Sequence, residues 1–254
     1  MKTFLAMLAR DAHVARRNLI FTLVQTLLQP MLLVFVFGRV MTASGFMPMN
    51  YKSLLLPGVI ALSMILAGVQ SVAMPLIAEF QFTREIEDRL LAPMEIEWLA
   101  VEKVIAGMAQ ALIAGRAVLP AAWLIMGKGV AVDLSHPFLF VGVALLVAAV
   151  AASVGLTLGC SVGQTQIGLM FSLVLAPMIF FGCTYYPWSA LESFPVLSKV
   201  VLANPVVYGS EGFRSALAPQ FLHLPVWSIF LGLFVAVTFF FLFGLRQFRK
   251  KAII

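Results

Sequence analysis

The chain has 254 residues, of which 62% are hydrophobic and only 11% are charged, and its formal net charge is +6. A soluble domain has about 25% charged residues, so this chain has too few charged side chains to cover a surface that faces water. The composition argues against a soluble enzyme, a nucleic-acid-binding protein and a disordered chain, and it predicts a protein that is embedded in membrane lipids.

Residues 1–18 precede the first long apolar stretch and mix apolar with charged side chains. Helical spacing brings the apolar ones near one stripe: Phe4, Leu5, Leu8, Ala12 and Ala15. Most of the charged ones fall elsewhere, which predicts an amphipathic helix on the inner membrane surface. A plain positively charged flank is the alternative.

Six apolar stretches are long enough to cross the hydrocarbon layer, which is roughly 30 Å thick. They are Leu19–Gly38, Leu54–Ala78, Val104–Met126, Pro137–Ser161, Ile167–Thr184 and Pro225–Leu245. Strands would leave backbone groups unpaired in lipid, so we expect an all-α membrane protein with six transmembrane helices. No glycine-rich linker divides the chain, which predicts a single transmembrane domain over residues 1–254.

The distribution of lysine and arginine predicts the topology. With both termini on the cytoplasmic side, eleven of these residues lie on the inner segments and five on the outer ones. Positive charge is enriched on the cytoplasmic side of membrane proteins, so this asymmetry favours cytoplasmic termini.

Three polar side chains within the predicted spans are candidates for a functional role. Gln25 and Gln29 share one face of the first span, where hydrogen bonds between helices explain them and a polar translocation wall is the alternative. Arg116 is the single ionisable residue well inside a span. A charge there needs a partner, and the candidates are Glu192, Glu211, backbone carbonyls or an anionic group of a substrate.

The inner connection 79–103 contains most of the acidic residues of the chain. Opposite charges recur there at helical i,i+4 spacing, as in the pairs Arg84–Asp88 and Glu85–Arg89. The pattern is typical of a short helix that faces water. It fits a docking surface for a partner, and an ordinary solvated loop is the alternative.

The outer segment 185–224 stays apolar although it is too broken to form a span. Pro187, Pro195 and Pro205 divide it into short helices. A free aqueous loop would not keep so many large apolar groups, so we expect a re-entrant or interfacial hairpin before the last span. The cluster of Tyr185, Tyr186 and Trp188 suits the membrane–water boundary.

The sequence has no pattern of a catalytic, nucleotide-binding or metal site. Gly127-Lys128 lacks the rest of a phosphate-binding loop, and no zinc or nucleophile motif occurs. Cys160 and Cys183 are expected at opposite ends of two spans, too far apart for a disulfide bond. We therefore expect no catalytic residue, no metal and no cofactor in this chain.

Two stretches carry a resemblance to a known family. Phe82–Pro93 is rich in Arg and Glu and ends in Leu90-Leu91-Ala92-Pro93, and Asn204-Pro205-Val206-Val207-Tyr208 is followed by Glu211-Gly212-Phe213-Arg214. Both stretches, in this order among six spans, resemble the permeases of the ABC-2 type transporter family, whose members export drugs, nodulation factors, polysaccharides or teichoic acids. Val206 departs mildly from the family's pattern, in which a bulkier apolar residue is usual at this position.

The resemblance implies a permease subunit in the bacterial cytoplasmic membrane that exports an amphipathic, lipid-linked or drug-like substrate. It implies a homodimer, or a heterodimer with a related permease, and separate ATPase subunits that bind ATP and Mg. The residues implied to couple the two are Arg84, Glu85, Glu87, Asp88, Arg89 and Pro93. Those implied at an outer gate are Tyr185, Tyr186, Trp188, Tyr208, Glu211 and Arg214. An ion-coupled secondary transporter and an integral-membrane lipid-modifying enzyme remain as alternatives.

Overall fold

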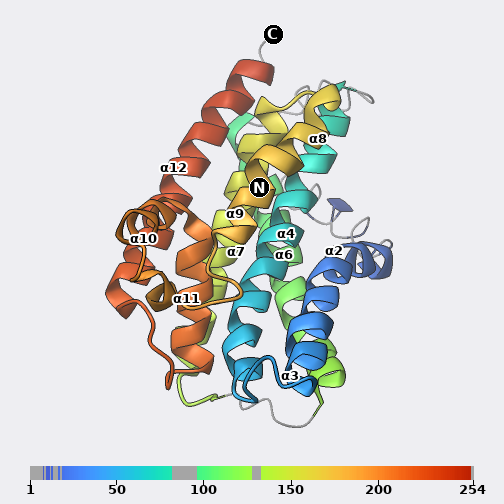
Figure 1. Cartoon of the computed structure of the whole chain (residues 1–254). Coiled ribbons are helices and arrows are strands. Elements are labelled where there is room, and N and C mark those ends of the chain that lie inside the picture. Colours follow the sequence, from blue (N-terminus) through green and yellow to red (C-terminus); the bar gives the residue numbers. More distant parts are fainter. Residues whose placement is uncertain are drawn as a thin grey trace.

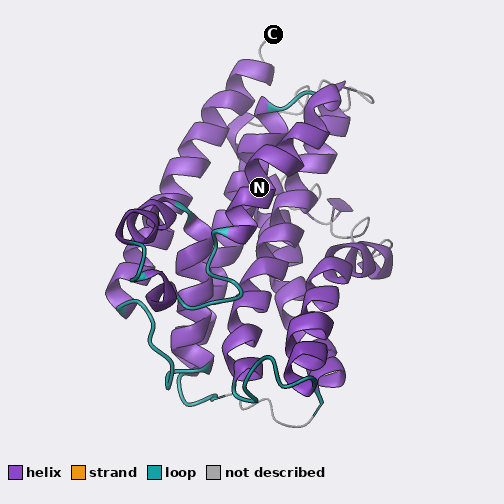
Figure 2. Cartoon of the chain, in the orientation of Figure 1, coloured by secondary structure: helices purple, strands orange, loops and turns teal. Residues whose placement is uncertain are grey.

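The computed structural model describes residues 19–81, 96–127 and 133–252, together with five residues before residue 19. The described part of the chain forms helices joined by short turns and contains no strand (Figures 1 and 2). The all-α prediction is therefore confirmed. The five residues described before residue 19 are helical, while the interfacial position of residues 1–18 stays a prediction.

Within the described part of the chain, five helices are long and apolar enough to cross a membrane. The first is a continuous helical segment in which α2 (Leu19–Leu33) passes into the π-helix η1 (Val34–Val40) and the short α3 (Met41–Ala43). The others are α4 (Tyr51–Gln81), α6 (Ile96–Met126), α7 (Pro137–Ser161) and α12 (Val226–Ala252). Four of the five contain a whole predicted span, and α12 contains the span Pro225–Leu245 except for its first residue.

The fifth predicted span, Ile167–Thr184, differs from the expectation. A shorter apolar helix covers Ile167–Phe180. Its pieces are α8 (Ile167–Leu169), the π-helix η3 (Met170–Leu175) and α9 (Ala176–Phe180), preceded by the 3₁₀ turn η2 (Gln164–Gln166). The stretch is apolar and helical as predicted, but the helix ends at Phe180, four residues before the predicted end at Thr184.

Helix α4 forms the centre of the bundle and packs against α6, α7 and α11 (Figure 1). Its contact with α7 is close because two glycines of α7 face it. A Cβ atom on Gly155 would lie 2.8 Å from the carbonyl oxygen of Val69, and one on Gly159 would lie 3.0 Å from the Cα of Ala73. The small-residue spacing of these glycines therefore marks a real helix–helix contact.

Short helices follow residues 181–187, which form a turn after α9 that we call the outer turn. The prolines predict these short helices. They are η4 (Trp188–Leu191), α10 (Pro195–Val200), η5 (Val201–Ala203) and α11 (Pro205–Leu217). Pro195 and Pro205 each occupy the first helical position, where the missing N–H costs nothing and the fixed φ angle suits the helix. Helix α11 returns to the interior and packs against α4, α7 and α12.

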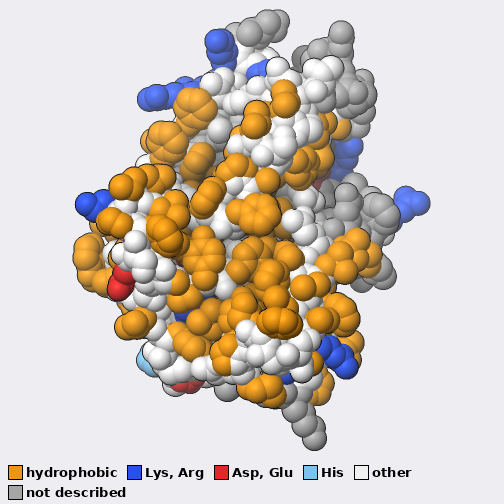
Figure 3. Space-filling view, in the orientation of Figure 1, with side chains coloured by type: hydrophobic (Ala, Val, Ile, Leu, Met, Phe, Trp, Pro, Cys, Tyr) orange, Lys and Arg blue, Asp and Glu red, His pale blue; other side chains and the backbone are white. Residues whose placement is uncertain are grey.

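The surface agrees with a membrane environment. Figure 3 shows hydrophobic side chains over most of one face, with lysines and arginines mainly near its ends and margins. This arrangement is the one expected where lipid tails cover the middle of a helical bundle and water reaches its two ends.

Candidate functional site

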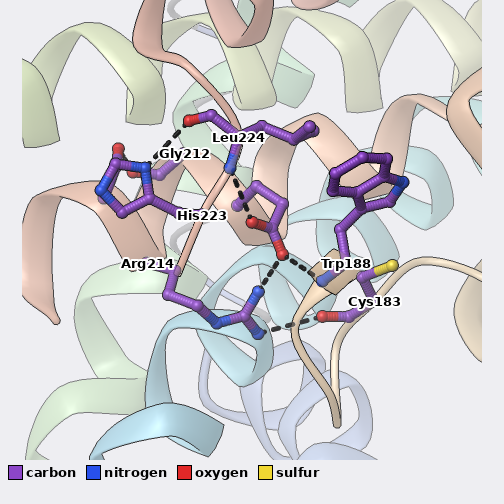
Figure 4. A network of polar contacts seen from close by, with 8 residues as sticks. Cys183, Trp188, Gly212, Arg214, His223 and Leu224 are labelled. Atoms are coloured by element: carbon purple, nitrogen blue, oxygen red, sulfur yellow. Dashed lines mark hydrogen bonds and ion pairs between the residues drawn. The ribbon is translucent and has the colours of Figure 1, made fainter. Parts of the chain in front are cut away.

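A buried network of polar contacts lies around α11, on the side of the bundle that is predicted to be the outer one (Figure 4). Glu211 and Arg214 stand one helical turn apart on α11 and form an ion pair, and both side chains are fully buried. The Oε1 atom of Glu211 also accepts a hydrogen bond from the backbone N–H of Trp188 at 2.8 Å. Its Oε2 atom accepts one from the backbone N–H of Leu224 at 3.1 Å.

Arg214 extends the network to the outer turn that follows α9. Its Nη2 atom donates to the carbonyl oxygen of Cys183 at 3.1 Å. Cys183 has a φ of 52°, a left-handed conformation that is uncommon for residues other than glycine. One ion pair thus fastens three separate segments to α11: the outer turn, the start of η4 and the connection to α12.

The Asn-Pro motif positions this pair by starting α11. The Oδ1 atom of Asn204 accepts from the backbone N–H of Val206 at 3.0 Å, which is the bond of an N-cap residue. Its Nδ2 atom donates to the carbonyl oxygen of Met178 at 2.7 Å and so links α11 to α9. The hydroxyl of Tyr208 donates to the carbonyl oxygen of Leu202 at 2.9 Å, which closes the turn before α11.

The aromatic residues of the outer cluster are fixed by backbone contacts. Tyr51 donates its hydroxyl to the carbonyl oxygen of Tyr185 at 2.8 Å, and the ring of Tyr185 stacks on Phe37 with centroids 5.7 Å apart. The indole of Trp188 donates to the carbonyl oxygen of Ser198 at 3.0 Å. Tyr186 donates to the carbonyl oxygen of Phe180 at 3.1 Å.

All six residues predicted at an outer gate therefore belong to one continuous region. Glu211 and Arg214 form its buried centre, while Tyr185, Tyr186, Trp188 and Tyr208 surround it and are partly buried. Within a single chain these side chains hold segments together. Their action as a gate stays a prediction.

Two outer cations that the sequence analysis used only for topology have a structural role. Lys52 donates from Nζ to the carbonyl oxygen of Met126 at 3.0 Å, and Arg39 donates from Nη1 to that of Ile125 at 3.2 Å. Both bonds satisfy carbonyl groups at the C-terminal end of α6, where positive charge also complements the helix dipole. They join the outer ends of three helices.

The polar residues within the spans are not brought together. Arg116 is exposed on the surface of α6, and Glu211, one of its candidate partners, is bound to Arg214 instead. Glu192 is exposed on the outer hairpin. Gln29 is exposed on α2 and bonds to no other described side chain, and the side chain of Gln25 lies outside the described part of the structure.

The residues predicted to couple the permease to an ATPase lie outside the described residues. They are Arg84, Glu85, Glu87, Asp88, Arg89 and Pro93. The helices on either side of them are described, and a buried ion pair joins these helices. Lys103 on α6 contacts Glu79 on α4 at 2.8 Å and Asp11 of the N-terminal region at 2.7 Å.

The structural role of Lys103 was not predicted from the sequence. Its side chain is only 5% exposed, so the two carboxylates compensate a positive charge that water hardly reaches. The signal was present in the sequence, because an acid at the end of one span and a base at the start of the next one meet when the spans pack side by side. The contact fastens the N-terminal region to the inner ends of α4 and α6.

Replacing Lys103 by Met is expected to lower the free energy of unfolding by about 2–3 kcal/mol, because it removes a buried cation from its ion pairs with Glu79 and Asp11. Denaturant unfolding of the protein in detergent micelles measures the change. Lys199→Met, at an exposed lysine of α10, is the control, with an expected effect within about 0.5 kcal/mol. Equal effects of the two substitutions would show that the inner ion pair contributes no stability.

The described residues offer no evident metal site, since no three His, Cys, Asp or Glu side chains among them are grouped to hold an ion. Both cysteines are buried and free, as predicted.

Comparison with protein families gives one match that covers most of the chain. The model of the ABC-2 type transporter family matches residues 2–218. The matched range begins in the N-terminal region and ends one residue after α11, so it includes both Glu211 and Arg214. No curated protein matches the chain.

Proposed function

Because the chain belongs to the ABC-2 type transporter family, we propose that it is the membrane-spanning permease subunit of an ATP-binding cassette exporter. The family match over residues 2–218 is the observation that carries this proposal. The apolar helices agree with it, since five of them have the length and composition of membrane spans.

In the proposed arrangement the chain crosses the bacterial cytoplasmic membrane six times, with both termini in the cytoplasm. The short helix Ile167–Phe180 provides the fifth crossing, and the outer turn extends it. The excess of lysine and arginine on the inner segments supports this orientation.

The outer hairpin 185–224 is proposed to dip back into the outer half of the membrane. Its helices are too short to span, and α10 exposes large apolar side chains: Val196 is 76% exposed and Val200 is 62% exposed. Such side chains are stable where lipid or a second permease covers them. We place an exit gate in this region, with the Glu211–Arg214 pair as its rigid support.

Two permease chains and separate ATPase subunits would complete the transporter, as a homodimer or as a heterodimer with a related permease. The ATPase subunits bind ATP and Mg, and their closure moves the spans through the cytoplasmic connection 79–103, of which residues 82–95 form the coupling segment. The cargo is an amphipathic, lipid-linked or drug-like molecule that leaves the cytoplasm.

Reversing the acidic charges of the coupling segment tests the proposal. The triple variant Glu85→Lys, Glu87→Lys and Asp88→Lys is expected to lose copurification with the ATPase subunit. The proposed contact pairs these acids with positive charges of the ATPase, and the introduced lysines would repel those charges. Retention of the ATPase on the affinity-tagged permease in detergent measures the effect. The control is Glu192→Lys, which reverses an exposed acid on the outer hairpin and is expected to keep the complex.

Two results would contradict the proposal. One is a triple variant that keeps both complex formation and transport at the level of the unmodified protein. The other is a tag inserted at Asp88 that is accessible only from outside the cell, since the ATPase subunits are cytoplasmic.

A further inference from the structure

We propose that the last turns of α12 hold the two helices that flank residues 82–95, and that Arg249 and Phe248 are positioning residues for the coupling of ATP hydrolysis to movement of the spans. This inference rests on the proposed function, because it assigns a role to residues next to the ATPase-coupling segment. It concerns residues that the family match does not cover, since the match ends at residue 218.

The helix before the coupling segment is held through Phe80. Helix α4 ends at Gln81, so Phe80 lies in its last turn. The ring of Phe80 meets that of Phe248 on α12 edge to face, with centroids 5.6 Å apart. The ammonium group of Lys251, on the same turn of α12, lies 4.9 Å from the centre of the Phe80 ring, which is a cation–π distance.

The helix after the coupling segment is held through Glu97. Helix α6 begins at Ile96, and Glu97 lies in its first turn. Arg249 of α12 forms an ion pair with the carboxylate of Glu97. The two helix ends that flank residues 82–95 are thus in contact with one short stretch of α12, Phe248–Lys251.

The anchor of this stretch is apolar and fully buried. Phe248 is 0% exposed and belongs to a cluster to which α4, α6, α7 and α12 all contribute. An exposed ion pair alone adds little stability, but here it is added to a contact that the buried phenyl ring already fixes. Together with the Lys103–Glu79 ion pair, the stretch therefore holds the ends of α4 and α6 that flank residues 82–95 in place.

Helix α12 also connects this inner contact to the outer network. It runs without a break from Val226 to Ala252, about 40 Å at 1.5 Å per residue. Leu224, two residues before its start, donates its backbone N–H to Glu211. A displacement of the coupling segment that moves α12 along its axis would thus reach the Glu211–Arg214 pair directly.

A charge exchange across the ion pair tests the inference. Arg249→Glu and Glu97→Arg, each alone, are expected to keep the ATPase bound but to lower the ATP hydrolysis rate of the complex in proteoliposomes by about threefold to fivefold. Each single variant places two like charges face to face. The double variant restores opposite charges and is expected to return the rate to within about twofold of the unmodified complex.

Lys250→Glu is the matched control, because it reverses the neighbouring charge at an exposed residue of the same turn. It is expected to leave the hydrolysis rate unchanged. If Lys250→Glu lowers the rate as much as Arg249→Glu, or if the double variant stays as low as the single ones, the positioning role is overturned and only a general effect of inner positive charge remains.

The experiment separates this inference from the proposed function. If the unmodified chain binds no ATPase subunit, the proposed function fails and the inference falls with it. If the unmodified complex forms and hydrolyses ATP while Arg249→Glu has no effect on the rate, the inference alone fails. Copurification is measured for every variant, so a lost complex is distinguished from lost coupling.

Discussion

Replacing Glu211 by Ala is expected to lower the free energy of unfolding by about 3–5 kcal/mol, because it leaves the fully buried guanidinium of Arg214 without a carboxylate. The same substitution removes the acceptor of two backbone N–H groups, at Trp188 and Leu224. Denaturant unfolding in detergent micelles, followed by circular dichroism, measures the loss.

A set of related variants separates the charge from the hydrogen bonds. Glu211→Gln keeps an acceptor of similar shape but removes the charge, and it is expected to cost less than Glu211→Ala. The double variant Glu211→Leu with Arg214→Met removes both charges, so it is expected to be more stable than either single variant. If the double variant is the least stable of the set, the ion pair contributes net stability and an uncompensated charge is not the main effect.

Replacing Gly58 by Ala is expected to lower the free energy of unfolding by about 3 kcal/mol, the upper end of the effect of overpacking. A Cβ atom on Gly58 would overlap the carbonyl oxygen of Thr184 and would lie 2.6 Å from its carbonyl carbon and 2.7 Å from its Cα. These are backbone atoms, which cannot move aside as a flexible side chain can. The outer turn would have to leave α4.

Gly168→Ala is the control for Gly58→Ala. Gly168 lies in α8, and a Cβ atom there would meet no atom within 4 Å. Because alanine favours a helix over glycine, this change is expected to be neutral or to stabilise by up to about 1 kcal/mol. Unfolding midpoints of the two variants are compared in the same detergent. Equal midpoints would mean that the contact between Gly58 and the outer turn does not contribute to the native packing.

Glu211→Ala and Gly58→Ala both act on the outer turn, so their effects on the free energy of unfolding should not be additive. Gly58 supports Thr184 from one side, and Arg214 holds the carbonyl oxygen of Cys183 from the other. A variant that displaces the turn from α4 has already weakened its bond to Arg214. The combined loss of stability is therefore expected to be smaller than the sum of the single losses.

The sequence predicted the features that depend on composition and length. Helices α4, α6, α7 and α12 each lie over a predicted span, because their apolar runs exceed what a water-exposed helix keeps. The short outer helices were also predicted, since proline fixes where a helix can begin. The regular helix over Ile167–Phe180 is shorter than expected because apolar character reports contact with lipid or core and not continuity of the helix.

The partners within the outer site could not be predicted in the same way. The sequence identified Glu211 and Arg214 as site residues, but Glu211 was considered as a partner of Arg116. The sequence alone does not show which helices face each other. The other members of the network are backbone groups of Cys183, Trp188 and Leu224. Every residue type has a backbone carbonyl, and every type except proline has a backbone N–H, so no motif marks a position that bonds through its backbone. The role of Lys103 was missed although its pairing with Glu79 had a signal in the sequence, and its second partner, Asp11, lies on a separate segment that no pattern marks.

The acceptor role of Glu211 has a consequence for how this protein can change over evolutionary time. The carboxylate holds positions 188 and 224 by their backbone N–H groups, which every amino acid except proline provides. Drift at these two positions therefore leaves both bonds intact unless proline arises. A homologous chain that keeps this carboxylate can therefore vary the side chains at both positions and still keep both hydrogen bonds.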